Sequence, residues 1–303
     1  MKENRQAHGP HFLGIGAPRS GTTWLHAMLD LHPEVWLPPI KEVHYFDSID
    51  PTLDEGFDRH LARRRIEKHM LHRMKHYLAV AARPFYAKAR IVSRPEFSWD
   101  LHYFAKGGDL EWYLELFDYA DSKPAVKLRG EITPAYFMLS DETISLIRDK
   151  TPIKKFVVLL RDPVDALWSM VRKRVRDGRI DQRKATDEDW LRVVQQPDLL
   201  RRYSYADNLE RWFRIVGREA VYVGFYEDIR DRPAMVLRDV CSFLGVRELS
   251  DAELPQARRR VNSTDGINRD MPASVRIKLR ELMCPQIEKL GGLIGDRAHM
   301  WLQ

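Results

Sequence analysis

The stretch that most constrains the fold runs from His11 to Asp30 and reads HFLGIGAPRSGTTWLHAMLD. The short apolar run 12–15 is typical of a strand, and the residues after Gly21 carry apolar side chains at helical spacing. The pattern predicts a strand, a loop and a helix. In such a unit the loop and the helix N-terminus can bind phosphate oxygens through backbone N–H groups.

The loop has the Gly16 to Gly21 spacing of a Walker A loop but lacks its lysine. Thr22 stands where that motif requires the cation that reaches the β and γ phosphates of a nucleoside triphosphate, and Arg19 is the cation inside the loop. Glycines between a strand and a helix also occur as simple turn residues. The glycine spacing by itself therefore leaves phosphate binding and plain turn formation open.

The run PRSGTTWL resembles the 5′-phosphosulfate loop, [KR]-[ST]-G-T-[ST], of the sulfotransferases that use 3′-phosphoadenosine 5′-phosphosulfate (PAPS), in particular their bacterial, Golgi and tyrosylprotein branches. The resemblance implies that Arg19 contacts the bridging oxygen and the sulfuryl group of the donor. It also implies donor-binding roles for the residues that follow, which are Ser20, Gly21, Thr22, Thr23 and Trp24.

Composition favours one large α/β domain over residues 1–303, since 44% of the 303 residues are hydrophobic and 31% are charged. The net charge of +6 fits an anionic cofactor or substrate without requiring nucleic acid as a partner. No apolar stretch has the length of a membrane span or of a signal region, so the expected location is the cytoplasm. Cys241 and Cys284 are expected to be buried thiols.

A polar pair follows in the segment 31–47, LHPEVWLPPIKEVHYFD, which is predicted to be a loop that leads into a short strand or turn. Strand alternation would place Glu42 and His44 on one face, where they can act as an acid and a base or simply be solvated. Lys41, Glu42, His44 and Phe46 match the K-E-x-H-F-F segment of heparan-type and bacterial sulfotransferases. By that resemblance, Glu42 deprotonates the acceptor hydroxyl, while His44 orients Glu42 or the acceptor and Lys41 assists at the sulfuryl oxygens.

Residues 55–108 are predicted to form a helical and aromatic insertion. Its basic helix, about 55–80, is either a solvated face or a rim that receives an acidic acceptor or steers the donor. The aromatic residues between Arg83 and Gly108 either line an acceptor pocket or attach a long loop to the core.

Two further segments match the family's order. KGGDLEWYLELF, residues 106–117, resembles its K-G-x-x-W-Y segment and is expected to be a structural helix. A strand over 125–128 leads into RGEITPAYF, which is similar to E-K-[ST]-P-x-Y. Glu131 and Tyr136 match this pattern, but Ile132 replaces a lysine that in some relatives lies near the sulfuryl group or the acceptor.

The second anion-binding motif follows the apolar run 155–160, which is typical of a strand buried on both faces of a parallel sheet. Arg161 lies at the end of this strand and Ser169 about two turns into the next helix, so both can reach one phosphate; the alternative is a surface ion pair and a helix serine. The segment resembles the family's 3′-phosphate motif, R-[DN]-P-x-x-x-x-x-S. An arginine usual between the two ligands is replaced, since Asp165 and Ala166 occupy that region.

The C-terminal third is predicted to contain helices at 188–195, 205–216 and 236–244, a strand at 221–225 and a last helix at 273–290. Glu227 and Asp228 begin a helix and are interpreted as structural. The family's R-K-G donor loop has no match here. Its substitutes are expected among Arg258, Arg259, Arg260, Asn262, Ser263 and Arg269. Of these, we predict that Arg269 binds the donor.

The alternation of strands and helices predicts a P-loop-type three-layer α/β/α fold with a central parallel sheet. The resemblance predicts a sulfotransferase that moves the sulfuryl group of PAPS to an acceptor hydroxyl of a sugar, lipid or natural product and leaves 3′-phosphoadenosine 5′-phosphate (PAP). No metal is expected, since no Asp, Glu and His cluster has ligand spacing. The alternatives are a P-loop phosphotransferase that uses ATP and a non-catalytic module that binds a polyanion.

Overall fold

One parallel sheet lies at the centre of the chain, whose computed structural model describes residues 8–53, 94–105, 108–176, 180–181, 185–250 and 270–302. Within these residues the strands follow the order β2 (Val35–Trp36), β3 (Leu128–Ile132), β1 (Phe12–Gly16), β4 (Lys155–Leu160) and β5 (Val221–Phe225). Every neighbouring pair is parallel, and Leu160 at the end of β4 lies opposite Phe225 at the end of β5. The carboxyl ends of the strands therefore meet at one edge, which is where parallel α/β sheets bind ligands.

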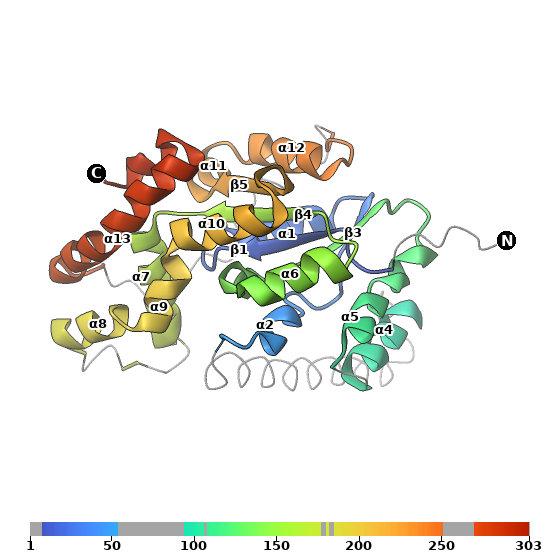
Figure 1. Cartoon of the computed structure of the whole chain (residues 1–303), viewed down its shortest axis with the longest axis horizontal. Helices are drawn as coiled ribbons and strands as arrows, with labels where there is room; N and C mark the ends of the chain where they lie inside the picture. The colour runs from blue at the N-terminus through green and yellow to red at the C-terminus, as the bar shows by residue number, and fades with distance from the viewer. Residues whose placement is uncertain are drawn as a thin grey trace, which may run out of the picture.

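Helices cover both faces of the sheet. α1 (Thr22–Asp30) and α12 (Pro233–Leu244) pack with Phe12, Val157 and Leu159 on one face. On the other face α6 (Asp141–Lys150), α10 (Tyr205–Val216) and α13 (Ala273–Ile294) share a larger core with Leu13, Ile15 and Val158. α6 and α10 cross in front of the strands in Figure 1. The predicted three-layer α/β/α fold is confirmed, and coverage on both faces explains why the central strands are continuously apolar.

The remaining helices lie around this sandwich. α4 (Arg94–Ala105) and α5 (Leu110–Glu115) lie at the end of the molecule opposite to α7, α8 and α9 (Figure 1). The bounds of the others are α2 (Phe46–Ile49), α7 (Pro163–Arg176), α8 (Asp187–Val194), α9 (Pro197–Tyr203) and α11 (Tyr226–Asp231), with 3₁₀ helices η2 (Asp118–Ser122), η3 (Pro134–Met138), η4 (Arg218–Ala220) and η6 (Asp296–Leu302).

Most predicted elements are present with small shifts. The strands at 155–160 and 221–225 are confirmed, and the helices predicted at 188–195, 205–216, 236–244 and 273–290 correspond to α8, α10, α12 and α13. The strand predicted at 125–128 was placed too early, because a turn at Pro124 and Ala125, closed by the Val126 N–H on the Lys123 carbonyl, delays β3 to Leu128. The helix predicted at 106–117 is shorter, because Asp109 caps α5 by accepting from the Trp112 N–H.

Most of the predicted insertion, including its basic helix, falls outside the described residues. The part that is described belongs to α4. Trp99 and Tyr103 stack with ring centroids 5.0 Å apart and are buried, and the Trp99 Nε1 donates to the Leu116 carbonyl beyond α5. These two aromatic residues therefore attach the segment to the core rather than line an acceptor pocket.

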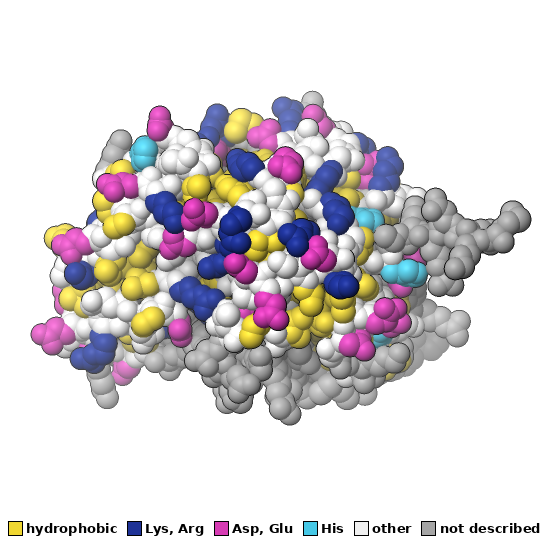
Figure 2. All heavy atoms as spheres, in the orientation of Figure 1, with side chains coloured by type: hydrophobic (Ala, Val, Ile, Leu, Met, Phe, Trp, Pro, Cys, Tyr) yellow, Lys and Arg dark blue, Asp and Glu magenta, His cyan; other side chains and the backbone are white. Residues whose placement is uncertain are grey.

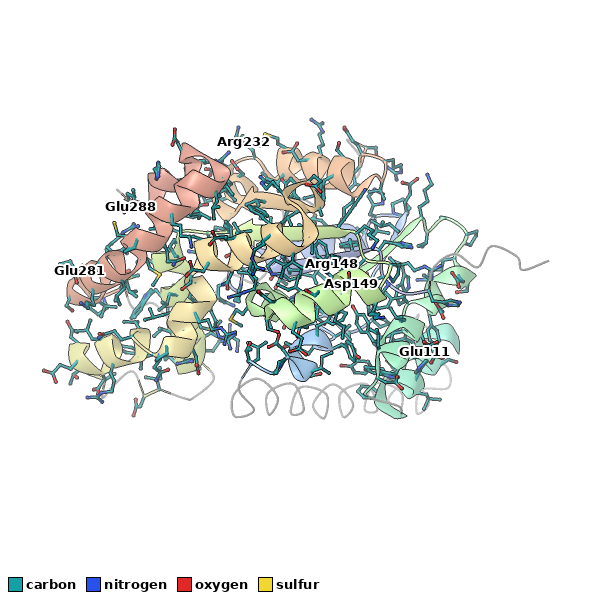
Figure 3. All side chains as sticks on the ribbon, viewed as in Figure 1. Glu111, Arg148, Asp149, Arg232, Glu281 and Glu288 are labelled. Atoms are coloured by element: carbon teal, nitrogen blue, oxygen red, sulfur yellow. The ribbon has the colours of Figure 1, made fainter. Side chains whose placement is uncertain are left out.

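The surface mixes charges of both signs. Figure 2 shows Lys, Arg, Asp and Glu interspersed on the face that carries α6 and α10. The labelled side chains in Figure 3 are surface groups of this kind, and Arg148 pairs with its exposed neighbour Asp149 at the end of α6.

Within the described residues no helix is long and apolar enough to cross a membrane. Cys241 is buried as expected, whereas Cys284 is only half-buried, so the prediction for that thiol was wrong.

Candidate active site

The loop after β1 lies at the carboxyl edge of the sheet and has several features that suit an anion. Gly21 begins α1 with a φ of 96°, and a Cβ at this position would lie 2.8 Å from the Ile229 Cδ1, so the turn requires glycine. The first N–H groups of a helix have no intrahelical acceptor, and the first turn of α1 has no acidic side chain. Thr22 and Thr23 add hydroxyl groups at this end of α1. The combination favours an anion.

Arg19 joins this loop to the motif 150 residues away. Its backbone is left-handed, with a φ of 65°, and its Nε donates to the Ser169 Oγ at 3.0 Å. Burial lowers the pKa of the Arg19 guanidinium, and the positive charges of Arg176, Arg161 and Arg172 act in the same direction. The two predicted anion motifs therefore form one site in which several guanidinium groups come together.

Arg161 is held beside this site by an aromatic ring. It follows β4 directly, and its guanidinium lies over the Tyr226 ring at 4.6 Å from the centroid. Its ion pair with Asp165 is long, at 3.9 Å, and the Asp165 side chain is only half-buried, so this carboxylate neutralises Arg161 only weakly. Arg161 is therefore positioned to bind an anion.

The residue that follows Arg161 is fixed by hydrogen bonds to two helices. The Asp162 carboxylate accepts from the Val164 N–H at 2.9 Å and from the Arg280 Nη2 at 2.9 Å, which attaches α13 to the start of α7. Burial, with the nearby Asp165 charge, raises the pKa of Asp162 although Arg280 opposes the shift. Asp162, the residue after Arg161, thus links the end of β4 to α7 and α13.

A second polar group lies in the segment before and within α2. The Lys41 Nζ donates to the Glu42 Oε1 at 2.5 Å, and the other Glu42 oxygen lies 3.4 Å from the His44 Nε2. The remaining His44 nitrogen, Nδ1, lies 2.6 Å from the Asp47 Oδ2. Asp47 is buried, and it was missed in the sequence although it stands one helical turn after His44. The four side chains form a continuous line of alternating charge.

Two histidines near this line have opposite electrostatics. Burial alone would lower the pKa of His44, but the Asp47 and Glu42 carboxylates outweigh it and raise the pKa to about 10, so the ring is an imidazolium at neutral pH. His26, one turn beyond Thr22 on α1, is neutral, because burial and the Lys41 charge lower its pKa to about 4 against the opposing effect of Glu42. Since Lys41 and Glu42 act on a residue of α1, this charged line faces the first helix.

Glu42 and His44 meet for a reason that strand alternation did not predict. Residues 41–45 form no strand, and β2 ends earlier at Trp36. Glu42 and His44 instead have left-handed backbones, with φ values of 65° and 59°. Such conformations cost on the order of 1–3 kcal/mol for residues other than glycine and cluster at functional sites. The prediction that Glu42 and His44 lie together agrees with the contact between their side chains. The strand alternation on which that prediction was based was wrong.

The remaining predicted site residues differ in their burial, and one of them lies outside the described part of the chain. Ser20 is fully buried, with its Oγ 3.4 Å from the Pro18 carbonyl, and Trp24 is buried in the core between α1 and the sheet. Arg269 lies outside the described residues. Tyr226, which supports Arg161, was not predicted, since an aromatic residue after β5 gives no distinctive signal. Among the described residues no group of three or more His, Cys, Asp or Glu could hold a metal ion.

The parallel sheet, the glycine-bounded loop and the helix N-terminus at its carboxyl edge define a nucleotide-binding fold of the P-loop type. The sequence matches the profile of the sulfotransferase family over residues 10–251, and the chain belongs to this family.

Solved sulfotransferases share the fold. A sulfotransferase from Alicyclobacillus acidocaldarius is 24% identical with a TM-score of 0.63, and the match covers 97% of this chain and 99% of that one. The sulfotransferase domain of the Synechococcus PCC 7002 olefin synthase is 18% identical over 97% of both chains, with a TM-score of 0.56. A mouse sulfotransferase in complex with PAP is 15% identical over 97% of this chain and 90% of that one, with a TM-score of 0.51. No curated protein sequence matches the chain.

Proposed function

We propose that this sulfotransferase uses PAPS as its donor and transfers the sulfuryl group to an acceptor hydroxyl, with Glu42 as the general base. The observation that carries the proposal is the hydrogen bond between the Arg19 Nε and the Ser169 Oγ, because it joins the 5′-phosphosulfate loop to the 3′-phosphate motif. PAPS carries phosphate at both the 5′ and the 3′ position of its ribose, so its binding needs both motifs in one site. ATP has no 3′-phosphate, so its binding does not need the second motif.

The donor side of the site fits such an anion. The N–H groups at the start of α1, with the side chains of Ser20, Thr22 and Thr23, would hold the 5′-phosphate, while Arg161 and Ser169 would hold the 3′-phosphate. Arg19 would neutralise charge on the departing phosphate oxygen and the sulfuryl oxygens. A guanidinium group can stabilise this charge without a metal ion. Trp24 and Arg269 stay as further donor-binding proposals.

PAPS supplies the sulfuryl group and releases PAP, so one bond to sulfur forms and one breaks. On the acceptor side, Glu42 takes the hydroxyl proton as the acceptor oxygen bonds to sulfur. Lys41 contacts the Glu42 Oε1 and would assist at the sulfuryl oxygens, and the imidazolium of His44, oriented by Asp47, contacts the other Glu42 oxygen. This arrangement holds the base in one orientation.

The acceptor class is proposed from the same group of residues. Glu42 and His44 match the pattern of heparan-type enzymes, which favours an aliphatic or sugar hydroxyl over a phenol. An unperturbed phenol has a pKa near 10 and needs less help from a base than an aliphatic hydroxyl does. A carboxylate that is positioned as a general base is therefore of more use to an aliphatic hydroxyl than to a phenol.

Calorimetric titration with PAP, AMP, ADP and ATP with magnesium tests the donor. We expect clear binding of PAP and a large loss of affinity for AMP, because AMP lacks the 3′-phosphate. Arg161→Ala should remove this preference, while the matched control Arg148→Ala should keep it. Arg148 is exposed on α6, whose C-terminal end leads to the start of β4, so it lies at the amino edge of the sheet (Figure 3).

Failure to bind PAP, or tighter binding of ATP with magnesium, would overturn the proposed donor and favour a phosphotransferase. Where PAP binds, an acceptor screen with labelled PAPS follows, and sugar and aliphatic alcohols should accept the label more readily than phenols.

A further inference from the structure

A buried carboxylate that makes no contact with the anion-binding motifs lies beneath the Glu42 segment. Glu131, on β3, is 1% exposed and accepts four hydrogen bonds, and among the described residues these donors are hydroxyl and backbone N–H groups rather than cations. The Oε1 accepts from the hydroxyls of Tyr113 at 2.8 Å and Tyr136 at 2.7 Å. The Oε2 accepts from the Thr133 Oγ1 at 2.7 Å and the Val43 N–H at 3.0 Å.

Glu131 reaches the Glu42 segment at two backbone positions. One is the direct bond from the Val43 N–H. The other runs through Tyr136, whose hydroxyl accepts from the Tyr45 N–H at 3.0 Å and donates to Glu131. Val43 and Tyr45 alternate with Glu42 and His44, the two residues with left-handed backbones. Each strained residue is therefore followed directly by an N–H that is tied to the same carboxylate.

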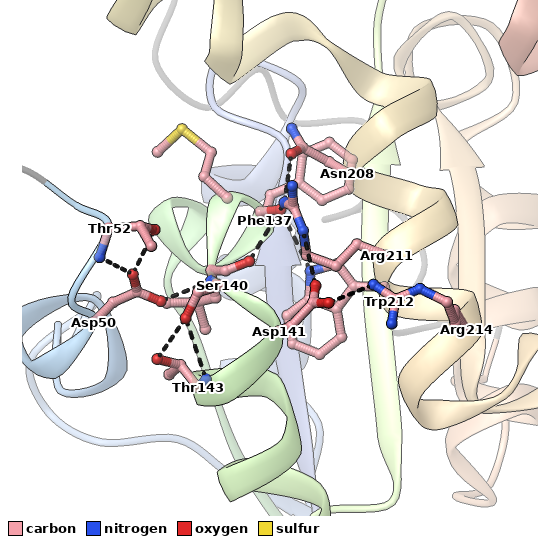
Figure 4. Close-up of polar contacts among 12 residues, drawn as sticks. Asp50, Thr52, Phe137, Ser140, Asp141, Thr143, Asn208, Arg211, Trp212 and Arg214 are labelled. Atoms are coloured by element: carbon pink, nitrogen blue, oxygen red, sulfur yellow. Dashed lines mark hydrogen bonds and ion pairs between the residues drawn. The ribbon is translucent and has the colours of Figure 1, made fainter.

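The far end of the segment is also fixed. Asp50, at the end of α2, accepts from the Ser140 N–H at 2.7 Å and from the Thr52 N–H at 2.8 Å, which attaches α2 to the start of α6 (Figure 4). The ring of Tyr45 stacks on Tyr113 at 4.7 Å between centroids. The chain from residue 43 to residue 50 is thus anchored at both ends to β3, η3 and α6.

We propose that Glu131 is a positioning residue for the acid–base group: with the Tyr136 hydroxyl, its carboxylate fixes the backbone N–H groups of Val43 and Tyr45 and so keeps Glu42 and His44 turned toward each other. Only an ionised carboxylate accepts four hydrogen bonds at these two oxygens, since an amide offers one acceptor oxygen and a carboxylic acid must donate. Burial raises the pKa of Glu131 although all four donors oppose the shift, so each donor that is lost favours protonation.

Tyr136→Phe tests the proposal, and Tyr113→Phe is its matched control. Both variants remove one hydroxyl donor from the same Glu131 oxygen and keep the ring, but Tyr113 makes no hydrogen bond to the backbone of residues 42–45. The first readout is the titration of His44, followed by NMR on protein with labelled histidine and assigned by the signal that His44→Gln loses. It needs neither donor nor acceptor.

We expect the His44 pKa, about 10 in the wild type, to fall by at least one unit in Tyr136→Phe, because the contact with Glu42 loosens, and to fall clearly less in Tyr113→Phe. An unchanged His44 pKa in Tyr136→Phe, or an equal fall in both variants, would overturn the proposal. If Tyr136→Phe does not fold, Glu131→Gln gives the same test, because the amide keeps the volume and loses acceptor positions.

The second readout is turnover, and it rests on the proposed function. Tyr136→Phe should lower kcat by about 10–100-fold through misplacement of the base, with the Kd for PAP unchanged. In a Glu42→Gln background, Tyr136→Phe should lower kcat by less than about twofold, because its effect on turnover depends on the Glu42 carboxylate. A full additional loss in that background would contradict the proposal. If the wild type binds no PAP, the proposed donor fails, while the His44 titration still decides the role of Glu131.

Discussion

His44 should make the stability of the protein depend on pH in a range where most side chains do not titrate. The ring is 15% exposed and lies between the Asp47 Oδ2 at 2.6 Å and the Glu42 Oε2 at 3.4 Å. Burial by itself would lower the pKa, and the two carboxylates raise it to about 10 from an ordinary 6.5. The folded protein therefore keeps a proton on this ring at pH values where the unfolded chain has lost it.

The magnitude follows from proton linkage. The stabilisation is fully present below pH 6.5 and is lost as the pH rises through about 10. Between these limits each pH unit lowers the free energy of unfolding by about 1.4 kcal/mol through this one group. From pH 7.5 to 9.5 the loss due to His44 amounts to about 3 kcal/mol.

Urea denaturation followed by tryptophan fluorescence at pH 7.5, 8.5 and 9.5 measures this slope. His44→Gln should be less stable at pH 7.5, and its free energy of unfolding should fall less steeply by about 1.4 kcal/mol per pH unit. His11→Gln is the matched control, because burial and the Arg129 charge lower the pKa of His11 and its titration lies below this range. That variant should keep the wild-type slope.

Equal slopes for the wild type and His44→Gln would refute the reasoning, since they would mean that His44 titrates near 6.5 and lacks its carboxylate partners in solution. Asp47→Asn provides an independent check. It removes the larger of the two favourable contributions, so it should lower the His44 pKa and remove most of the extra slope.

Three further outcomes are expected. Glu42→Gln should lower turnover by roughly 10²–10⁴-fold in an acceptor assay while the Kd for PAP, measured by calorimetry, stays within about twofold, and near wild-type activity would exclude Glu42 as the base. Arg161→Ala and Ser169→Ala should each weaken PAP by about 10–100-fold in calorimetry and leave AMP nearly unaffected, since only the 3′-phosphate contact is lost; equal losses for both nucleotides would place these residues elsewhere. Trp212→Ala should lower the free energy of unfolding by about 3–5 kcal/mol in urea, because this ring is fully buried on α10 and its Nε1 donates to the Phe137 carbonyl, and a loss under 1 kcal/mol would contradict that packing.

The fold was predictable because its signals are local. The runs 155–160 and 221–225 are short, apolar and bounded by polar residues, and such runs become strands that are buried on both faces. The predicted start of β3 was wrong for an equally local reason. Pro124 and Ala125 form a turn, so residues that the hydrophobic pattern assigned to the strand lie before it. Boundaries set by turns are not visible in hydrophobic patterning alone.

The relative positions of the site residues were predictable only where a motif lies at a strand end that is followed by a helix. The loop 16–21 and the pair Arg161 and Ser169 depend on a strand end followed by a helix, so their positions follow from the fold. The orientation of Glu42 and His44 does not. It depends on left-handed backbones held by Glu131, 88 residues further along the chain, and no spacing within residues 41–47 encodes that contact.

Ile132 shows how one departure from the family pattern is accommodated. Its side chain is fully buried on the α1 face of the sheet, whereas Glu131, the preceding residue of β3, points to the opposite face. Gly14 is the strand partner of Ile132, and a Cβ on Gly14 would lie 2.7 Å from the Ile132 Cγ1. The isoleucine thus fills the space that the glycine leaves open. A lysine at this position would have to extend past β1 and α1 to expose its charge. Under the proposed function, a cation near the sulfuryl group or the acceptor therefore has to come from another residue, and we propose Lys41, which contacts the Glu42 carboxylate, for that role.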